Sequence, residues 1–296
     1  MSSIPVIDLI SGAGKDLIGA CEEWGCFRIV NFQEILEDSL LREMKAVVRS
    51  LLDLPAAVKS RNRDVIAGSG YMAPSETNPH YEALGLFDMA SPPDVQAFCS
   101  NLEATPYQRD TILKYAKKVN QVMREIVLKI GQGLGINDVP NLDDWSCQFR
   151  INKYNFSSET MGCRGVQLHT DSSFLTLLQD DEKFGGLEIM KRNGEFHAVE
   201  PCPGTLLVNL GDLATVWSNG KFLNVKHRVI CKEVGIRVSI ASFLLGPNDE
   251  KIVAPPELVD LEHPRMYVPF TFRELRNLRM SEKLHIGEAL RYYLCK

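Results

Sequence analysis

The sequence has none of the features that mark nucleic-acid-binding or membrane-bound proteins. Its 296 residues carry a formal net charge of -5, and no segment gathers lysines and arginines into a dense cluster with interleaved aromatics. No apolar run approaches the roughly 20 residues that a membrane-spanning helix requires. The first residues lack the basic and apolar segments of an export signal, and the last ones match no prenylation or peroxisomal signal. We therefore expect neither nucleic acid nor a membrane as a partner.

The eight cysteines also lack organisation, because they form neither a Cys-x-x-Cys pair nor the spacing of a disulfide framework. Scattered thiols fit a reducing compartment, so a cytoplasmic protein with free cysteines is expected. Internal repeats, low-complexity tracts and linkers are absent as well. With 45% hydrophobic residues the chain can bury a sizeable core, and we expect residues 1–296 to form a single structural unit.

Within that unit the residue pattern changes twice. Residues 1–140 are predicted to be a mainly helical supporting region that includes two short strands, 4–9 and 26–30, and residues 251–296 are predicted to be helical. Residues 141–250 consist of short apolar and β-branched runs, broken by Gly, Pro or Asn about every eight to twelve residues, as in an antiparallel sandwich or barrel. The candidate strands of this core are residues 147–154, 174–179, 187–190, 196–199, 205–209, 226–231 and 237–245. The predicted fold class is mixed α+β.

Three stretches outside the core have distinct patterns. Apolar residues recur at helical spacing over residues 37–52 and 112–134. Residues 61–93 contain too many glycines and prolines for long regular elements, so they form either the wall of a binding site or a variable surface connection. Near the end, Thr271 is predicted to open a helix with a capping box, and Ser281 to cap a further helical segment.

A histidine and an acid one residue apart, His169 and Asp171, precede an apolar run. In an extended backbone these two side chains face the same side, so they can bind one ion, although such a pair often arises by chance. His227 is the best third ligand, because it begins a strand-like run and several strands in between can bring the chain back. Two histidines and one carboxylate leave three adjacent coordination positions open, as in non-haem iron(II) oxygenases. Zinc with the same ligands is chemically possible.

A second set of polar residues explains what could fill those positions. Arg237 and Ser239 lie on one face of a strand soon after His227. An inward arginine in an apolar strand needs an anion, and a guanidinium holds a carboxylate with two hydrogen bonds. An outward arginine on the sheet surface would be preferred if this motif stood alone. On another predicted strand Arg150 and Tyr154 share a face, and Tyr154 can offer its phenol to the same carboxylate.

Taken together, these motifs resemble those of the plant-type 2-oxoglutarate and iron(II)-dependent dioxygenases. The resemblance covers nearly the whole chain and is carried by residues 4–8, 24–27, 152–154, 169–171, 227 and 237–239. It implies a distorted double-stranded β-helix (jelly roll) core that holds iron(II) through His169, Asp171 and His227, with O2 as the oxidant. It also implies that 2-oxoglutarate is bound by Arg237, Ser239, Tyr154 and Asn152.

Four further segments, residues 68–71, 81–92, 148–154 and 241–247, resemble members of that family that act on auxin. They imply a small-molecule substrate of the indole-3-acetic acid type, free or conjugated to an amino acid, that is oxidised to the 2-oxindole form. The reaction would release succinate and CO2. Hydroxylation of another plant metabolite, such as a gibberellin, a phenolic or an alkaloid, is the alternative, because the related enzymes share much of the scaffold.

A substrate of that kind needs a cation and a surface for its ring. Arg150 is the first candidate for the cation, and its alternative role is to brace the sheet through a buried acid. Candidate ring partners are Tyr71, Tyr81, Phe156, Phe174, Trp217 and Phe243, although aromatic side chains in strands more often fill the core. His80 is an outside possibility for the site. A zinc hydrolase and a non-catalytic protein that binds small acids remain as alternatives from other classes.

Overall fold

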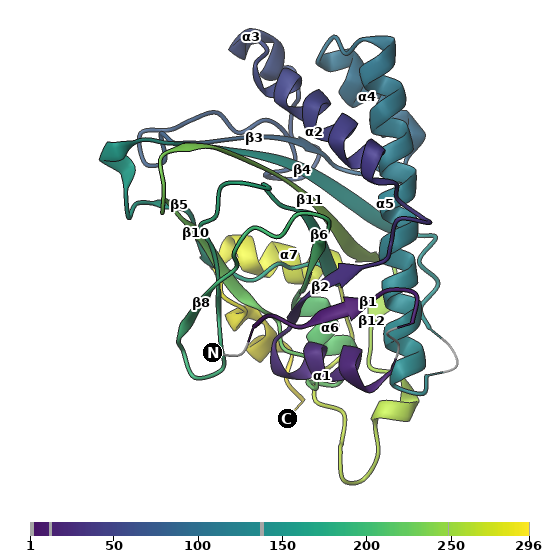
Figure 1. The fold of residues 1–296 in the computed structure, drawn as a ribbon. Helices are drawn as coiled ribbons and strands as arrows, with labels where there is room; N and C mark the ends of the chain where they lie inside the picture. The colour runs from purple at the N-terminus through teal and green to yellow at the C-terminus, as the bar shows by residue number, and fades with distance from the viewer. Residues whose placement is uncertain (1–2, 12–13, 137–138, 248, 296) are drawn as a thin grey trace.

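Two β-sheets form the centre of the molecule, whose computed structural model describes residues 3–11, 14–136, 139–247 and 249–295 (Figure 1). The larger sheet, in spatial order, contains β1 (Val6–Asp8), β2 (Cys26–Val30), β9 (Leu206–Leu210), β6 (Leu175–Gln179), β11 (Gly235–Pro247), β4 (Trp145–Phe156) and β3 (Tyr81–Leu86). The smaller sheet contains β5 (Arg164–His169), β10 (Lys226–Ile230), β7 (Leu187–Met190) and β8 (Phe196–Ala198). All of these neighbours pair antiparallel except β1 and β2, which are parallel. This architecture agrees with the predicted jelly roll.

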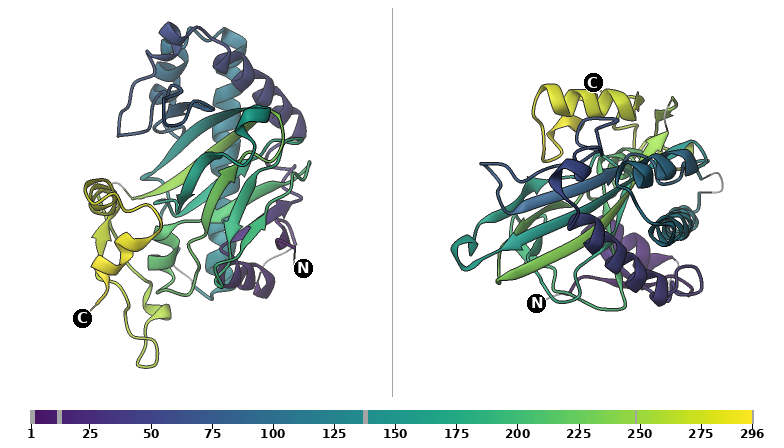
Figure 2. Two further views of the ribbon diagram at one scale, coloured as in Figure 1. Left: turned by 90° about the vertical axis from the view of Figure 1, so that its left-hand side faces the viewer. Right: turned by 90° about the horizontal axis from the view of Figure 1, so that it is seen from above.

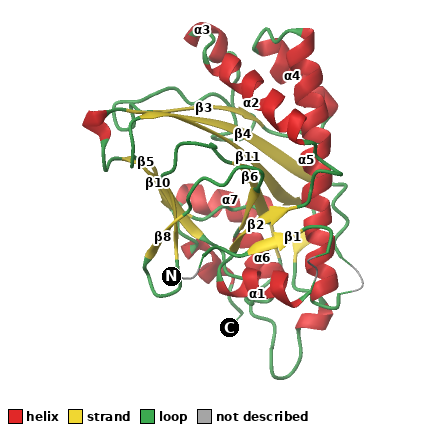
Figure 3. Ribbon diagram, in the orientation of Figure 1, coloured by secondary structure: helices red, strands yellow, loops and turns green. Residues whose placement is uncertain are grey.

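Helices cover one face of the larger sheet, as the red elements of Figure 3 show. The helices of this layer are α1 (Lys15–Glu23), α2 (Asp38–Leu52), α3 (Ala56–Lys59), α4 (Pro92–Asn101) and α5 (Pro106–Gly133). Two more helices, α6 (Asp212–Trp217) and α7 (Phe272–Ser281), belong to the second half of the chain. The longest, α5, begins with the capping box that Thr105 and Gln108 form. Its apolar stripe packs against α2 and the sheet, where the Tyr115 ring meets Phe149 of β4. This contact anchors the helical layer to the strands that carry the site.

Strand β4 divides its side chains between two cores. Phe149 and Ile151 lie in the core under the helices, whereas Tyr154 and Phe156 lie in the core between the two sheets. Successive side chains of β4 therefore alternate between the two cores, as the sequence pattern predicts. Both sets are buried because the sheet is covered on both faces. Whatever polar residues occupy the even-numbered positions of β4 must face the space between the sheets.

The remaining elements lie near the C-terminus. A small two-stranded sheet joins β12 (Lys251–Ile252) to β13 (Phe270–Thr271), and short 3-10 helices occur at Ser158–Thr160, Pro256–Leu258 and Glu288–Tyr293. In both views of Figure 2, α7 and the C-terminal segment (yellow) lie apart from α1 and α2 (purple). Within the described ranges, no helix is both long and apolar enough to cross a membrane.

The structure corrects several expectations about the elements. The N-terminal region contributes β3 as well as the two expected strands, and β3 lies inside the expected loop of residues 61–93. Pairing with β4 over Tyr81–Leu86 explains this strand, because it supplies the hydrogen bonds that the local sequence does not predict. The capping box at Thr271 is confirmed, but Ser281 ends α7 instead of opening a helix. Strand β5 is absent from the candidate strands, although extended backbone was expected around His169 at its end, and helix α6 was not expected.

Candidate active site

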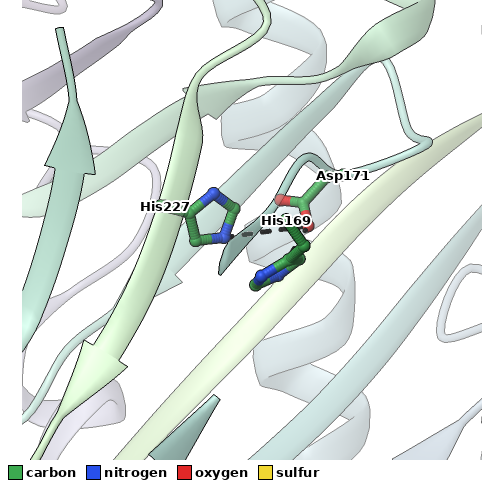
Figure 4. A group of neighbouring side chains, drawn as sticks. All are labelled: His169, Asp171 and His227. Atoms are coloured by element: carbon green, nitrogen blue, oxygen red, sulfur yellow. Dashed lines mark ion pairs between the residues drawn. The ribbon is translucent and has the colours of Figure 1, made fainter. Parts of the chain in front are cut away.

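Three potential ligand side chains converge between the sheets (Figure 4). His169 is the last residue of β5, and His227 lies directly opposite it on β10. Asp171 follows two residues after the end of β5, so it does not share a strand with His169 as the sequence suggested. Its Oδ1 is nevertheless 3.6 Å from Nε2 of His169 and 3.9 Å from Nε2 of His227. The potential ligand atoms of the three residues all lie within 4.8 Å of one another.

Hydrogen bonds to neighbouring groups orient these side chains. Nδ1 of His169 lies 2.8 Å from the carbonyl oxygen of Gln167, and Nδ1 of His227 lies 3.2 Å from that of Val225. A carbonyl can only accept, so both rings carry their proton on Nδ1 and leave the Nε2 lone pair facing Asp171. The hydroxyl of Thr176 donates to the other carboxylate oxygen of Asp171 at 2.6 Å. The arrangement leaves Nε2 of each histidine and one carboxylate oxygen of Asp171 available to bind an ion from the same side.

Electrostatics favour the ligand forms of these groups. Burial and the neighbouring His227 lower the pKa of His169 to about 4, so its imidazole is neutral at neutral pH. Burial alone would raise the pKa of Asp171, but the two histidines and the Thr176 hydrogen bond leave it below its usual value. Two imidazoles and one carboxylate form a set that suits a divalent transition metal with open positions.

The two distances from Asp171 to the histidine nitrogens pass a simple geometric test for binding one ion. Two atoms that each lie about 2.1 Å from one ion can be at most about 4.2 Å apart. Both distances to Asp171 satisfy that limit. Elsewhere in the described ranges no second group of three such side chains comes together. The residues present therefore fit the iron(II) site that the motifs predict.

A cavity of about 160 Å³ lies beside the three ligands, between the two sheets. It is several times larger than the share of about 30 Å³ that one water occupies in the liquid, so it has room for a small organic acid. The four predicted cosubstrate residues, Arg237, Ser239, Tyr154 and Asn152, all line it. In the register of β11 and β4, Arg237 is opposite Tyr154 and Ser239 is opposite Asn152. The structure thus brings the predicted set together beside the metal ligands.

Arg237 is a buried positive charge that lines this inner cavity. Its side chain is 1% exposed, and one end of the guanidinium pairs with Asp180, which the sequence reasoning missed. The Ser239 hydroxyl lies 3.5 Å from Nη1, the Tyr154 ring centroid lies 5.1 Å from the guanidinium carbon, and Nε has no partner among the described residues. A buried donor without an acceptor costs about 1–3 kcal/mol, so the guanidinium, although paired with Asp180 at one end, has a donor left for a further acceptor. A carboxylate from a cosubstrate would supply it.

A larger cavity of about 1060 Å³ extends outward from the metal ligands. His169, Asp171, Tyr81, Arg150 and Phe243 line both cavities, so the two spaces meet at the ligands. The outer wall includes residues of the 61–93 stretch, which favours its interpretation as a binding wall over a mere surface connection. His80 also lines this outer space.

Arg150 faces the outer cavity without an acidic partner among the described residues. Its Nε donates to the Tyr81 hydroxyl at 3.2 Å, and one terminal nitrogen donates to the carbonyl of Gly68. The alternative role of bracing the sheet through a buried acid is therefore not what the structure shows. Arg276 of α7 lines the same cavity and donates to the carbonyl of Ala67, next to Gly68. The two arginines come from elements 126 positions apart and bind consecutive carbonyls of one turn.

The predicted ring partners divide into two groups. Tyr81 and Phe243 line both cavities. The other four, Tyr71, Phe156, Phe174 and Trp217, line neither cavity. Phe174 contacts Trp217 within the helix-side core, Phe156 stacks on Tyr154, and the Tyr71 hydroxyl donates to Glu82 at 2.7 Å. These rings fill volume or brace the sheet, because both faces of the larger sheet are covered and offer apolar residues a core position.

Sequence reasoning also missed polar residues at the site. Asn209 lines the inner cavity, and its side-chain oxygen is buried with no partner among the described residues. The available signal was one amide inside the apolar run of β9. Arg276 and Arg279 of α7 line the outer cavity. Their signal was weaker, because arginines three positions apart on a helix more often mark a solvated face.

Comparisons with known proteins agree with this geometry. Residues 145–246 match the 2OG-Fe(II) oxygenase superfamily, and residues 4–104 match the family described as non-haem dioxygenase in morphine synthesis N-terminal. The chain is 47% identical to the 2-oxoglutarate-dependent dioxygenase DAO of Oryza sativa subsp. indica, with 98% of each chain covered.

Solved structures give the same result. A crystal structure of the rice dioxygenase for auxin oxidation has a TM-score of 0.90 and 46% identity, and covers 99% of this chain and 100% of that one. Dioxygenase for auxin oxidation 1 from Arabidopsis thaliana, in a binary complex with 2-oxoglutarate, has a TM-score of 0.85 and 52% identity. The match covers 89% of this chain and 100% of that one. These similarities extend over both sheets and the helical layer, not over the metal motif alone.

Proposed function

Because this chain belongs to the 2-oxoglutarate- and iron(II)-dependent dioxygenases, we propose that it oxidises indole-3-acetic acid or an amino-acid conjugate of it to the 2-oxindole form. Succinate and CO2 are the products of the cosubstrate. The substrate assignment is supported by the similarity to proteins described as dioxygenases for auxin oxidation. The structural observation that carries it is an outer cavity in which Arg150 and Arg276 face a wall shared with Tyr81 and Phe243.

The family membership sets aside the zinc hydrolase and the non-catalytic acid-binding protein. A gibberellin, phenolic or alkaloid hydroxylase remains the alternative within the family. All eight cysteines are free in the structure, which supports a proposed cytoplasmic location. The partner that we propose is a small molecule.

The chain's own residues prepare the reaction by binding and shielding. Iron(II), held by His169, Asp171 and His227, supplies the redox chemistry that couples decarboxylation of 2-oxoglutarate to oxidation of the substrate by O2. We propose that Arg237 and Ser239 bind the distal carboxylate of 2-oxoglutarate. Tyr154 adds its phenol to this carboxylate, and Asn152 completes the wall as the acceptor of the Tyr81 hydroxyl at 2.7 Å.

Apolar side chains close the remainder of the inner cavity. Leu178, Leu187, Val229 and Ala241 line it from both sheets. They exclude water from the space beside the metal ligands, which protects a reactive centre from side reactions. The outer cavity is where a ring and its carboxylate are then held.

Turnover with defined acids tests the proposed substrate. Purified protein is supplied with iron(II), 2-oxoglutarate and O2, and succinate and the oxidised acid are measured together. We expect indole-3-acetic acid or its amino-acid conjugates to give succinate and a 2-oxindole product in equal amounts. Faster coupled turnover with a gibberellin or a phenolic acid would contradict the substrate assignment while leaving the dioxygenase chemistry intact.

The two outer arginines should control recognition of the substrate carboxylate. A hydrogen bond to a charged group contributes about 1.5–3 kcal/mol, so Arg150→Gln and Arg276→Gln should each raise KM for the acid by about 10- to 150-fold. The KM for 2-oxoglutarate should not change. Steady-state kinetics with each acid measure both values.

Two controls make this test specific. Arg273→Gln, at an exposed position on the same helix, should behave as the unmodified protein. The methyl ester of the substrate lacks the charge, so its KM should respond little to either arginine substitution. If acid and ester are affected equally, the arginines shape the cavity and do not bind the carboxylate.

A further inference from the structure

The C-terminal helix α7 makes direct contact with the residue between two metal ligands. Arg279 donates from Nη1 to the Thr170 hydroxyl at 3.0 Å and from Nη2 to the Thr170 carbonyl at 2.7 Å. The same guanidinium pairs with Asp212 at the start of α6 and donates to the His285 carbonyl at 3.2 Å. Residues 109 positions apart in the sequence therefore meet beside the metal site.

These contacts separate Arg279 from the two outer arginines. The two terminal nitrogens of a guanidinium carry four N–H donors, and for Arg279 each of the four has an acceptor. Arg150 and Arg276 retain unused terminal donors. Arg279 thus has little capacity left for a substrate carboxylate, although it lines the same cavity. Its terminal N–H groups all donate to groups of the protein itself.

The segment that Arg279 holds has no sheet pairing to fix it. His169 is the last residue of β5, and Thr170 and Asp171 lie beyond the strand. Their backbone is held instead by three tertiary contacts. The Thr170 amide donates to the His285 carbonyl at 2.8 Å, the Asp212 amide donates to the Asp171 carbonyl at 2.8 Å, and Arg279 binds the Thr170 carbonyl. The direction of the Asp171 side chain therefore depends on α6 and on the C-terminal segment.

The acid that anchors Arg279 is itself fixed. Asp212 is 0% exposed, and its second oxygen accepts a hydrogen bond from Asn224 at 2.8 Å. Gly287, at φ +83°, packs so closely that a Cβ there would lie 2.7 Å from the Asn224 amide nitrogen. This close fit packs the C-terminal segment against Asn224, the residue that holds Asp212.

We propose that Arg279 is a positioning residue of the metal site, which couples the docking of α7 to the geometry of His169 and Asp171 by fixing Thr170 between them. The inference depends on the three metal ligands and not on the identity of the substrate. Groups that orient metal ligands from outside the coordination shell typically change metal affinity by about 10- to 100-fold when they are replaced. We expect a loss of that size.

Metal titration tests this proposal without relying on turnover. Arg279→Lys keeps the charge beside Asp212 but removes the fork that reaches Thr170 and His285 together. A second variant, Arg279→Gln with Asp212→Asn, removes both charges and so leaves no buried carboxylate unpaired. Arg273→Gln on the same helix is the matched control. For each protein the Mn2+ dissociation constant is measured by calorimetry, with circular dichroism and the Tm of the metal-free form as measures of folding.

The proposal predicts an Mn2+ dissociation constant about 10- to 100-fold weaker in both Arg279 variants and unchanged in the control. The metal-free Arg279→Lys protein should remain folded, as its circular dichroism and a cooperative thermal transition would show. With Mn2+ at saturation, the dissociation constant for 2-oxoglutarate should be the same in all folded variants, since Arg279 does not touch the inner cavity. If either folded variant binds Mn2+ as tightly as the control, Arg279 only secures the helix and the proposal fails.

Discussion

Asp171→Ala is expected to reduce succinate formation to background and to remove the visible charge-transfer band that iron(II) and 2-oxoglutarate give together without O2. Asp171 is the one carboxylate among the three ligands, and its removal leaves two neutral imidazoles to hold a dication. The substitution also leaves the Thr176 hydroxyl without its acceptor, which costs about 1–3 kcal/mol. A domain stabilised by about 5–15 kcal/mol remains folded after such a loss.

Anaerobic titration with iron(II) followed in the visible range measures this effect directly. Asp110→Ala, which replaces an exposed acid on α5 far from the ligands in sequence, is the matched control and should titrate normally. A band of normal intensity in folded Asp171→Ala protein would show that the metal is held by other residues.

Arg237→Gln is expected to have the second largest effect, a rise of about 100-fold or more in the KM for 2-oxoglutarate. Two hydrogen bonds between a guanidinium and a carboxylate contribute about 1.5–3 kcal/mol each, and glutamine supplies neither the charge nor the fork. The affinity for the metal should change little, because the polar and ring contacts of Arg237 in the described part of the chain are with Ser239, Asp180 and Tyr154, not with the three ligands. Kinetics at varied 2-oxoglutarate concentration measure this KM, and metal titration measures the affinity for the metal.

The buried partner of Arg237 complicates that experiment. Removing one member of a buried ion pair costs about 3–5 kcal/mol, because Asp180 would stay charged and unpaired. The double variant Arg237→Gln with Asp180→Asn removes both charges and is the better test in a stable protein. Arg237→Lys keeps the charge but lacks the planar guanidinium. Its KM for 2-oxoglutarate should therefore lie between those of the unmodified protein and the double variant. Equal activity at low 2-oxoglutarate in the double variant would mean that Arg237 does not bind the cosubstrate.

The strand period made much of the site predictable from the sequence. Arg150, Asn152 and Tyr154 alternate with Ile151 and Lys153 on β4, and Arg237 and Ser239 alternate with apolar neighbours on β11. In a strand between two packed faces, alternation alone fixes which side chains share a side. The polar residues therefore had to meet in the space that the second sheet covers, and the structure places them there.

What the sequence could not give depends on tertiary contacts. Phe174 and Trp217 look like any other aromatic residues of a β-rich region, and only the packing of α6 against the sheet places them in the core. Arg276 and Arg279 lie more than 100 positions from the metal motif, and their roles follow from how α7 docks. Asp171 was expected on a strand because local alternation cannot show where a strand ends.

Strand β4 also fixes the distance between the two residues that are proposed to bind carboxylates. Side chains on one face of a strand are about 6.8 Å apart, so Arg150 and Tyr154, four residues apart, are separated by roughly 14 Å along the strand. If the first holds the substrate acid and the second the cosubstrate acid, the rigid backbone sets the span between the two carboxylates. An acid with a longer or shorter arm would then present a different carbon to the metal. The spacing of the strand would then contribute to selecting the position of oxidation.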